Sequence, residues 1–322
     1  MTNATLATRL VADVGGTNTR LALYDYDSHQ LRAIQSYTNR DEGSFETIIG
    51  NWLQDLDEPA PEDACIAVAA PPDGDRVVMS NMDWSISRQD LATQFGFNRI
   101  RVINDFESNA YALPHLGAES LSLIHRGEPS ASDCPRLATI GPGTGLGGAV
   151  LQKAGGVWDA IACEPGHMAL APVGSAELEI WRVLSKQHPR IYTELLVSGP
   201  GLVHLYGALA EVQGIDSSIN SPEEISRRGV QYEDQVCVDT LALFCRLLGT
   251  ACADFVLANG SYGGLYLAGG ILPRMLDFFA ASGFPDRFID RGPVAAQLER
   301  MPINVVTHSF QGLLGAGNAP LH

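Results

Sequence analysis

Two glycine-rich segments of one design constrain the fold of this chain more than any other feature. They are LVADVGGTNTRLALYD at residues 10–25 and LATIGPGTGLGGAVLQ at residues 137–152. In each, an apolar run meets a glycine turn that carries a threonine, Thr17 or Thr144, and a second strand-like run follows. Each segment therefore predicts two antiparallel strands joined by a tight turn, and the recurrence of the pattern indicates a weak internal repeat.

The two turns do not match two common nucleotide-binding motifs. The Walker A pattern GxxxxGK[ST] is absent, and neither turn contains a lysine. A dinucleotide fingerprint requires a helix after the glycines, whereas the strand-like GGAVLQ follows here. An ordinary hairpin is an equal alternative for either turn alone, but two matching turns favour backbone amides that hold a phosphate.

Asp13 ends the first predicted strand, immediately before the glycines of the first turn. A carboxylate in this place could hold a hydrated magnesium ion beside a nucleotide phosphate. It could also do no more than cap the turn.

The charge of the chain limits the partners we expect. The 322 residues include 21 basic and 37 acidic ones, which gives a formal net charge of −16. This field repels polyanions, so we expect no nucleic acid and no anionic membrane as a partner. A small phosphate ligand remains compatible, because backbone N–H groups and a divalent cation can hold it.

Composition predicts a cytoplasmic globular protein. No apolar stretch approaches the roughly 18 residues of a membrane span, and the first ten residues, MTNATLATRL, lack the pattern of a signal peptide. The six cysteines show no CxxC spacing, so we expect buried thiols rather than disulfides.

The order of predicted elements is typical of two α/β domains. In the first half, three strands joined by hairpins precede a helix from Ser44, a strand at 65–70, a strand at 76–81, a strand at 100–105 and a helix from Phe106 that stops near Pro114. Residues 115–136 are rich in turn formers and are expected to be irregular. Strands and helices then resume, with a long apolar-faced helix at 239–258. We expect a small lobe at 1–113 plus 303–322, and a large lobe at 114–302.

Three of these segments, DVGGTN, GPGTGLGG and LAGGI, resemble the phosphate and adenosine motifs of the actin-like sugar kinase superfamily. The resemblance implies two α/β lobes of the actin-like ATPase (ribonuclease H-like) type, with the active site in the cleft between them. For LAGGI alone, a simple turn at a helix start is the alternative. The nucleotide contacts implied by the resemblance are Asp13, Val14, Gly15, Gly16, Thr17, Asn18, Gly143, Thr144, Gly145, Gly269 and Gly270.

A closer resemblance, over essentially the whole chain, is to bacterial glucokinases of the hexokinase type. That family's sugar-site motifs are matched in order by INDF at 103–106, EPGH at 164–167 and TELLVSGPG at 193–201. The resemblance implies a homodimer, ATP with Mg²⁺, and transfer of the γ-phosphate to the 6-hydroxyl of glucose. It also makes Asp105 the catalytic base and implies hydrogen bonds to the sugar from Asn104, Glu164, His167 and Glu194.

The chemistry of these residue types suits the roles that the resemblance implies. Carboxylates and an amide select sugar hydroxyls, which both donate and accept. Asp105 falls where a strand meets a helix, and the helix dipole there favours a carboxylate that can accept a proton. The expected reaction is direct in-line transfer, without a phosphoenzyme.

Each sugar-side residue also has a purely structural interpretation. Asn104 and Asp105 could cap the following helix, Glu164 and Glu194 could be solvated surface carboxylates, and His167 could be a structural histidine. Only their order and their association with both glycine turns favour a sugar site. Asn81 and Trp84 are further candidates for its border, although core packing explains Trp84 equally well.

Departures from related families narrow the function. A related kinase and repressor family carries a zinc motif, CxCGxxGCxE, after its ExGH, whereas APVGSAELE follows His167 here, so we expect no structural zinc. A sugar-sensing repressor is a weaker alternative, because no basic N-terminal helix-turn-helix is present. A kinase for mannose, fructose or an N-acetylhexosamine remains open, since contacts around C2 decide the preference. A non-enzymatic actin-like scaffold would not explain why the three sugar motifs occur together.

Overall fold

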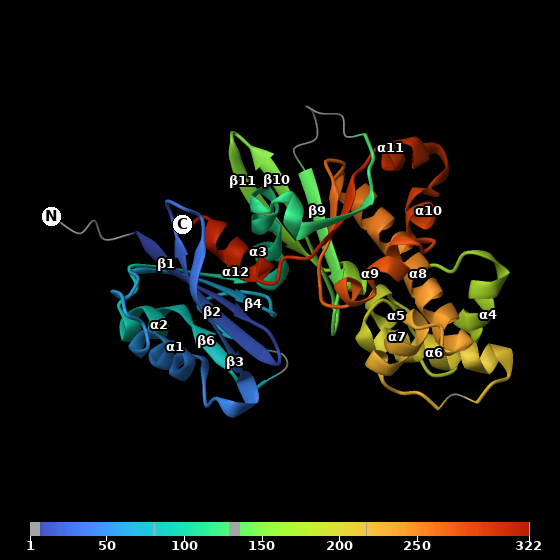
Figure 1. The fold of residues 1–322 in the computed structure, drawn as a ribbon, viewed down its shortest axis with the longest axis horizontal. Helices are drawn as coiled ribbons and strands as arrows, with labels where there is room; N and C mark the ends of the chain where they lie inside the picture. Colours follow the sequence, from blue (N-terminus) through green and yellow to red (C-terminus); the bar gives the residue numbers. More distant parts are fainter. Residues whose placement is uncertain (1–6, 80–81, 129–135, 217, 322) are drawn as a thin grey trace. The chain divides into compact units, whose positions relative to one another are not determined.

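The computed structural model describes residues 7–79, 82–128, 136–216 and 218–321, and the chain divides into two compact units (Figure 1). The first unit contains the chain up to Gly117, the segment Trp158–Ala162, and the chain from His308 onward. The second unit contains Ala118–Val157 and Cys163–Thr307. Each unit has a mixed β-sheet of its own with helices packed on it.

These units differ from the expected lobes in three places, the first being residues 114–117, which belong to the first unit and not to the second. Residues 303–307 were expected in the small lobe, but the strand β13 (Ile303–Val306) pairs with β12 (Leu265–Leu267) and β8 (Leu121–His125), which keeps it in the second unit. The strand β11 (Val157–Cys163) is divided, and its residues Trp158–Ala162 belong to the first unit. Sequence patterns report local structure, and neither long-range assignment has a local signal.

The sheet of the first unit has the order β3-β2-β1-β4-β7. Strands β1, β2 and β3 are antiparallel neighbours, whereas β1, β4 and β7 run parallel. The bounds are β1 (Thr8–Val14), β2 (Asn18–Asp25), β3 (Leu31–Thr38), β4 (Asp63–Val68) and β7 (Arg99–Asn104), and a separate hairpin joins β5 (Arg76–Val78) and β6 (Ser85–Ser87). The predicted strands at these places are therefore confirmed, while residues 80 and 81, including Asn81, lie outside the described residues.

The first helix of the first unit begins at the predicted place. The hydroxyl of Ser44 accepts from Thr47 N, and the apolar residues that follow at helical spacing are buried, with Trp52 against the sheet core. Trp84 packs on the same core. The helices are α1 (Phe45–Gln54), α2 (Arg88–Phe95), α3 (Asp105–Ala112) and α12 (Gln311–Asn318).

The C-terminal helix α12 is built into the first unit by close packing. It contacts β1, β2, β4 and, most extensively, α3, beside which it lies in Figure 1. A Cβ atom at Gly315 would overlap the backbone of Ser108 in α3, and one at Gly317 would overlap the ring of Tyr24. The guanidinium of Arg9 donates to three carbonyls at the end of α12. Only glycines allow this approach, so the last helix is fixed to α3 and β1.

The sheet of the second unit includes the strand order β10-β9-β12-β13-β8. β9 (Arg136–Pro142) and β10 (Leu146–Ala154) form the predicted antiparallel pair. The expectation that residues 115–136 are irregular is wrong for β8, a five-residue strand within that stretch. β8 lies at the edge of the sheet and pairs with β13, so tertiary pairing overrides the turn-rich sequence around it.

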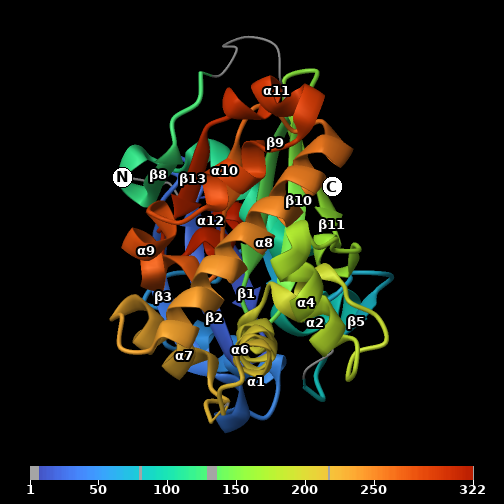
Figure 2. The ribbon, with the colours of Figure 1, turned by 90° about the vertical axis from the view of Figure 1, so that its right-hand side faces the viewer.

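Helix α8 (Gln235–Asn259) runs through the centre of the second unit (Figure 2). By length and composition it could span a membrane, which contradicts the expectation that no such stretch exists, but 72% of its most apolar window is buried inside the protein. It packs against α6, α7 and α10. The other helices are α4 (Gly174–Leu184), α5 (Thr193–Leu196), α6 (Gly199–Gln213), α7 (Pro222–Val230), α9 (Leu276–Ala280), α10 (Phe284–Ile289) and α11 (Ala295–Glu299).

The described cysteines are free thiols, as the sequence predicts. Cys237, Cys245 and Cys252 are buried along α8, Cys65 is buried in β4, and Cys163 is half-buried. Cys134 lies outside the described residues.

Candidate active site

Hydrogen bonds within the first glycine turn and from Asn39 fix its conformation. Gly15 N donates to Asn18 O at 3.0 Å, which closes the turn between β1 and β2. The Asn39 side chain donates to Gly15 O at 2.8 Å, and Asn39 N donates to Thr17 O at 2.9 Å. Gly16, Thr17 and Asn18 are exposed, so these residues of the turn are accessible to a ligand.

The expected base lies on the same sheet edge as this turn. Along the parallel strands, Val14 is in register with Val68 of β4, and Val68 is in register with Asn104 of β7. Asp13 and Asp105 therefore lie near the carboxyl ends of strands that are separated by β4, a spacing of roughly 10 Å. The carboxyl edge of parallel strands is where α/β proteins place their ligands.

The junction between β7 and α3 sets the orientation of the Asp105 side chain. Asn104 Oδ1 accepts from Phe106 N at 2.9 Å and from Glu107 N at 3.3 Å, so the capping interpretation is confirmed for Asn104. Its amide nitrogen can still donate to a ligand. Asp105 is the first residue of α3, is half-buried, and its Oδ1 accepts from Phe106 N at 2.9 Å.

The surroundings of Asp13 disfavour the ionised form of its carboxyl group. Burial raises the pKa of Asp13, and the guanidinium of Arg20, whose Nη1 lies 3.2 Å from Asp13 Oδ2, only partly opposes this shift. The side chain keeps 24% of its surface accessible. A Cβ atom at Gly312 would stand 3.0 Å from the Asp13 carboxyl carbon, so α12 limits the space on that side.

The raised pKa of Asp13 predicts that its ionised carboxylate lowers the stability of the folded protein, and that this cost depends on pH. The ionised form of Asp13 is disfavoured in the folded state, so protonation below the unfolded pKa removes the penalty, and the penalty returns as the pH rises through the folded pKa. We expect Asp13→Asn to raise the midpoint of thermal unfolding at pH 8 and to raise it less at pH 4. A variant that is less stable than the parent at both pH values would contradict this reading.

The second glycine turn lies in the second unit and carries a network of its own. Gly143 N donates to Gly145 O at 2.8 Å, and Gly199 N, at the start of α6, donates to Gly143 O at 2.8 Å. Leu146 N donates to Glu194 Oε2 at 2.7 Å. The turn between β9 and β10 is thus tied both to the α6 N-terminus and to an expected sugar-side carboxylate.

The glycines around Glu194 are required by its position. A Cβ atom at Gly145 would stand 2.5 Å from Glu194 Oε2, and one at Gly166 would stand 3.1 Å from the same oxygen. Glu194 is half-buried, whereas Glu164 and His167 are exposed at the two ends of the short 3-10 helix η4 (Pro165–His167). The His167 ring packs edge-on against Tyr192 at 5.8 Å. The structure therefore gathers the EPGH and TELL residues around one glycine turn.

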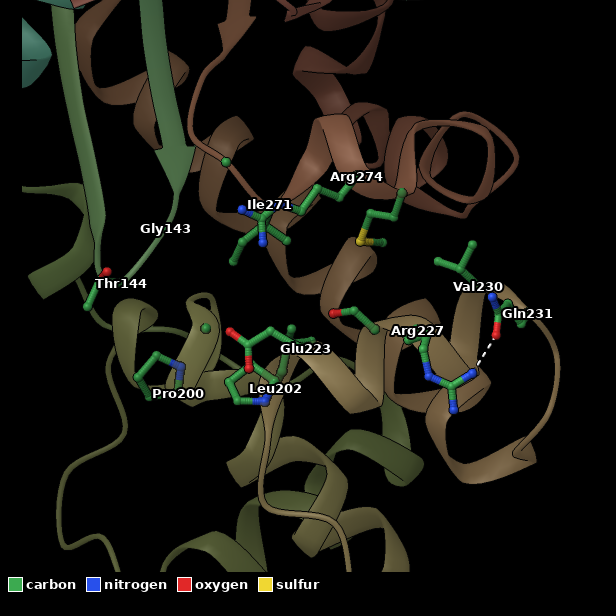
Figure 3. A pocket seen from close by; sticks show the side chains of 15 residues that line it. Gly143, Thr144, Pro200, Leu202, Glu223, Arg227, Val230, Gln231, Ile271 and Arg274 are labelled. Carbon is green, nitrogen blue, oxygen red and sulfur yellow. Dashed lines mark hydrogen bonds between the residues drawn. The ribbon is translucent and has the colours of Figure 1, made fainter. Parts of the chain in front are cut away.

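A pocket of about 630 Å³ opens beside this turn, entirely within the second unit. Figure 3 shows Gly143 and Thr144 at one end of it and Gln231 at the other. Apolar side chains of the wall come from α6, α7 and the segment after β12, namely Leu202, Val230, Ile271 and Met275. A slot with apolar walls and amides at one end suits a flat ring joined to phosphates.

The expected adenosine-side loop closes this pocket. Gly269 has φ +87°, and a Cβ atom there would stand 2.5 Å from Pro142 O, so the loop lies directly on the second glycine turn. Gly270 lines the pocket.

Polar residues of the pocket were not identified from the sequence. Glu223 and Arg227 on α7 and Arg274 after β12 line it, and Arg227 Nη1 donates to Gln231 Oε1 at 2.5 Å, as Figure 3 shows. Hydrogen bonds from its own N–H and from Ser221 lower the pKa of Glu223. The hydroxyl of Ser221 caps α7, the helix that carries Glu223 and Arg227. Asn39 was missed likewise, because its role depends on a turn 24 residues away.

Among the described residues, no group of three or more His, Cys, Asp or Glu side chains is placed to hold a metal ion. Cys163 and His167, the nearest approach to the zinc motif in sequence, are therefore not part of such a group.

Two α/β units, each with a glycine turn between antiparallel strands, define the class of two-lobed, actin-like sugar kinases. Comparisons with known proteins agree. A family model described as Glucokinase matches residues 10–321. The glucokinase of Saccharophagus degradans is 36% identical over 312 residues, which cover 95% of this chain and 96% of that protein. The chain thus belongs to the glucokinase family, and it is an enzyme, a glucose kinase.

Solved structures support the same fold. The crystal structure of a glucokinase from an Antarctic psychrotroph superposes with a TM-score of 0.89 at 35% identity, covering 97% of this chain and 98% of the other. A ROK family glucokinase from Streptomyces griseus, in complex with glucose and AMPPNP, gives a TM-score of 0.63 at 20% identity, covering 96% and 98%. The predicted fold class is confirmed.

Proposed function

We propose that this glucokinase transfers the γ-phosphate of ATP to the 6-hydroxyl of glucose in one in-line step. The observation that carries the proposal is the hydrogen bond between Leu146 N and Glu194 Oε2, at 2.7 Å. It joins a carboxylate suited to sugar hydroxyls with a glycine turn suited to phosphate. Donor and acceptor groups of the reaction would therefore meet at this turn.

Asp105 acts as the general base in this proposal. It accepts the proton of the 6-hydroxyl while the oxygen attacks phosphorus, and no covalent phosphoenzyme forms. Asn104, Glu164, His167 and Glu194 hold the other hydroxyls: the carboxylates of Glu164 and Glu194 accept, and the side chains of Asn104 and His167 can donate as well as accept. Asp105 belongs to the first unit and Glu194 to the second.

ATP occupies the pocket of the second unit in this proposal. Gly269 and Gly270 flank the adenosine, and the amides of Gly143, Thr144 and Gly145 receive the phosphates. Supporting this, the pocket runs from that turn to Gln231, and apolar side chains form part of its wall. Asp13, Val14, Gly15, Gly16, Thr17 and Asn18 supply the second phosphate turn. The kinase in complex with AMPPNP has the same fold, which is consistent with a nucleotide donor.

Mg²⁺ fits the first turn on electrostatic grounds. Asp13 is a carboxylate whose burial outweighs its compensation by Arg20, so a nearby divalent cation would relieve its raised pKa. Asp13 would hold the ion through a water molecule, and the ion would neutralise charge on the transferring phosphate.

A panel of sugars tests the substrate. With Mg·ATP and ADP detection, we expect glucose to give the highest kcat/KM, and mannose, fructose and N-acetylglucosamine to give lower values. A higher value for any of these would instead support the alternative hexose kinase. Binding of DNA in an electrophoretic assay, together with no turnover of any sugar, would support the sugar-sensing regulator.

Two glycines of one turn should separate the effects on the two substrates. In Gly145→Ala the new methyl group would displace Glu194, so we expect a raised KM for glucose. In Gly143→Ala the methyl group meets no protein atom within 4 Å, at a residue that lines the pocket, so we expect a raised KM for ATP. Tenfold changes of this kind correspond to about 1.4 kcal/mol. The same KM rising in both variants would contradict these assignments.

We also propose a cytoplasmic homodimer. A cytoplasmic location supplies the ATP that the reaction consumes. Light scattering on the purified protein checks the assembly, and the mass of a single 34.5 kDa chain at micromolar concentration would contradict it.

A further inference from the structure

An ion pair lies beneath the junction that carries Asp105. Arg101 Nη2, from β7, lies 2.7 Å from Glu107 Oε1, from α3, and the two side chains keep only 21% and 11% of their surface accessible. The other carboxylate oxygen, Glu107 Oε2, accepts from Asn104 N at 3.4 Å. The pair therefore links a residue four positions before Asp105 to one two positions after it.

Further contacts hold this pair from outside the junction. Arg101 Nη1 donates to Pro320 O at 2.7 Å, near the C-terminal end of the chain. The guanidinium also lies over the ring of Tyr111, with its Cζ atom 5.7 Å from the ring centroid. The pKa of Glu107 is raised, mainly by burial and also by the charge of Asp159. Arg101 and the Asn104 N–H partly oppose this shift. Separating a largely buried pair leaves a charge without its partner, which is strongly destabilising, so the pair favours one geometry.

We propose that Arg101 and Glu107 are positioning residues for the catalytic base. The inference rests on the proposed role of Asp105. The pair closes a ring of contacts through β7, Asn104 and the first turn of α3, and this ring fixes the direction in which the Asp105 carboxylate leaves the helix. Misplacement of a reacting group by about 1 Å can lower a rate roughly a hundredfold, so a rigid support has a direct kinetic effect.

The test replaces the charge of Glu107 and keeps its shape. In Glu107→Gln the side chain can still accept from Asn104 N, but Arg101 loses its anion. We expect kcat to fall roughly tenfold to a hundredfold, with KM for glucose and for ATP within about threefold of the parent. The exposed pair Arg76–Asp90 supplies a matched control in the same unit, and Asp90→Asn should leave kcat unchanged.

Arg101→Lys provides a second variant that keeps the positive charge but loses the planar fork. If Glu107→Gln does not fold, the same split between kcat and KM in Arg101→Lys supports the proposal. A folded variant of either kind with parental kcat overturns it. Asp105→Ala, assayed in parallel, separates the two hypotheses: if it also keeps parental kcat, the proposed role of Asp105 as the base fails, independently of the roles of Arg101 and Glu107.

Discussion

Asp105→Ala should lose nearly all turnover and should still bind glucose. Removing a general base typically lowers kcat by about 10²–10⁴. Glucose should still bind, with a Kd raised by no more than roughly tenfold, because one hydrogen bond among several is lost. Steady-state kinetics with ADP detection gives kcat, and calorimetric titration with glucose gives Kd.

The matched control for this variant is Asp57→Asn, an exposed aspartate of the same unit, which should leave both constants unchanged. Parental turnover in Asp105→Ala, with glucose still bound, would show that another group accepts the proton. Loss of glucose binding together with turnover would instead assign Asp105 to sugar recognition.

Gly315→Ala should be among the most destabilising single changes in the first unit. A methyl group there would overlap the backbone oxygen of Ser108, and a backbone atom cannot move aside without shifting α3 or α12. Overpacking of this severity costs roughly 3 kcal/mol, which lowers the midpoint of thermal unfolding by on the order of 10 °C. Since α3 carries Asp105, we expect kcat to fall as well.

Gly207→Ala is the control for the glycine change. Gly207 lies inside α6, and a Cβ atom there meets nothing within 4 Å. Alanine should therefore stabilise this helix by roughly 0.5–1 kcal/mol. A Gly315→Ala protein with a parental midpoint would show that α3 and α12 are not packed as closely as described.

Local patterns predicted the elements that build the site. The glycine turns follow from apolar runs interrupted by glycine, and both are observed between paired antiparallel strands. The helix start at Ser44 follows from the preference of helix starts for side chains that accept from the backbone. These features are determined within a few residues, which is why a single sequence reveals them.

Features that depend on distant pairing could not be predicted. β8 is a strand because β13, more than 170 residues later, pairs with it. Asn39 supports Gly15 across two strands, and Gly315 meets Ser108 only after α12 returns to the first unit. Arg101 and Glu107 appeared as ordinary charged residues of a strand and a helix, because burial and partnership are properties of the folded chain.

The position of phosphate on the product tests the central claim most directly. After incubation of the purified protein with glucose and Mg·ATP, a proton–phosphorus correlation spectrum identifies the carbon that carries the phosphate. We predict coupling of the new phosphorus resonance to the two protons on C6, and far less of this product from Asp105→Ala in the same incubation time. Coupling to a proton on another carbon, or no phosphorylated glucose at all, would contradict the proposed reaction.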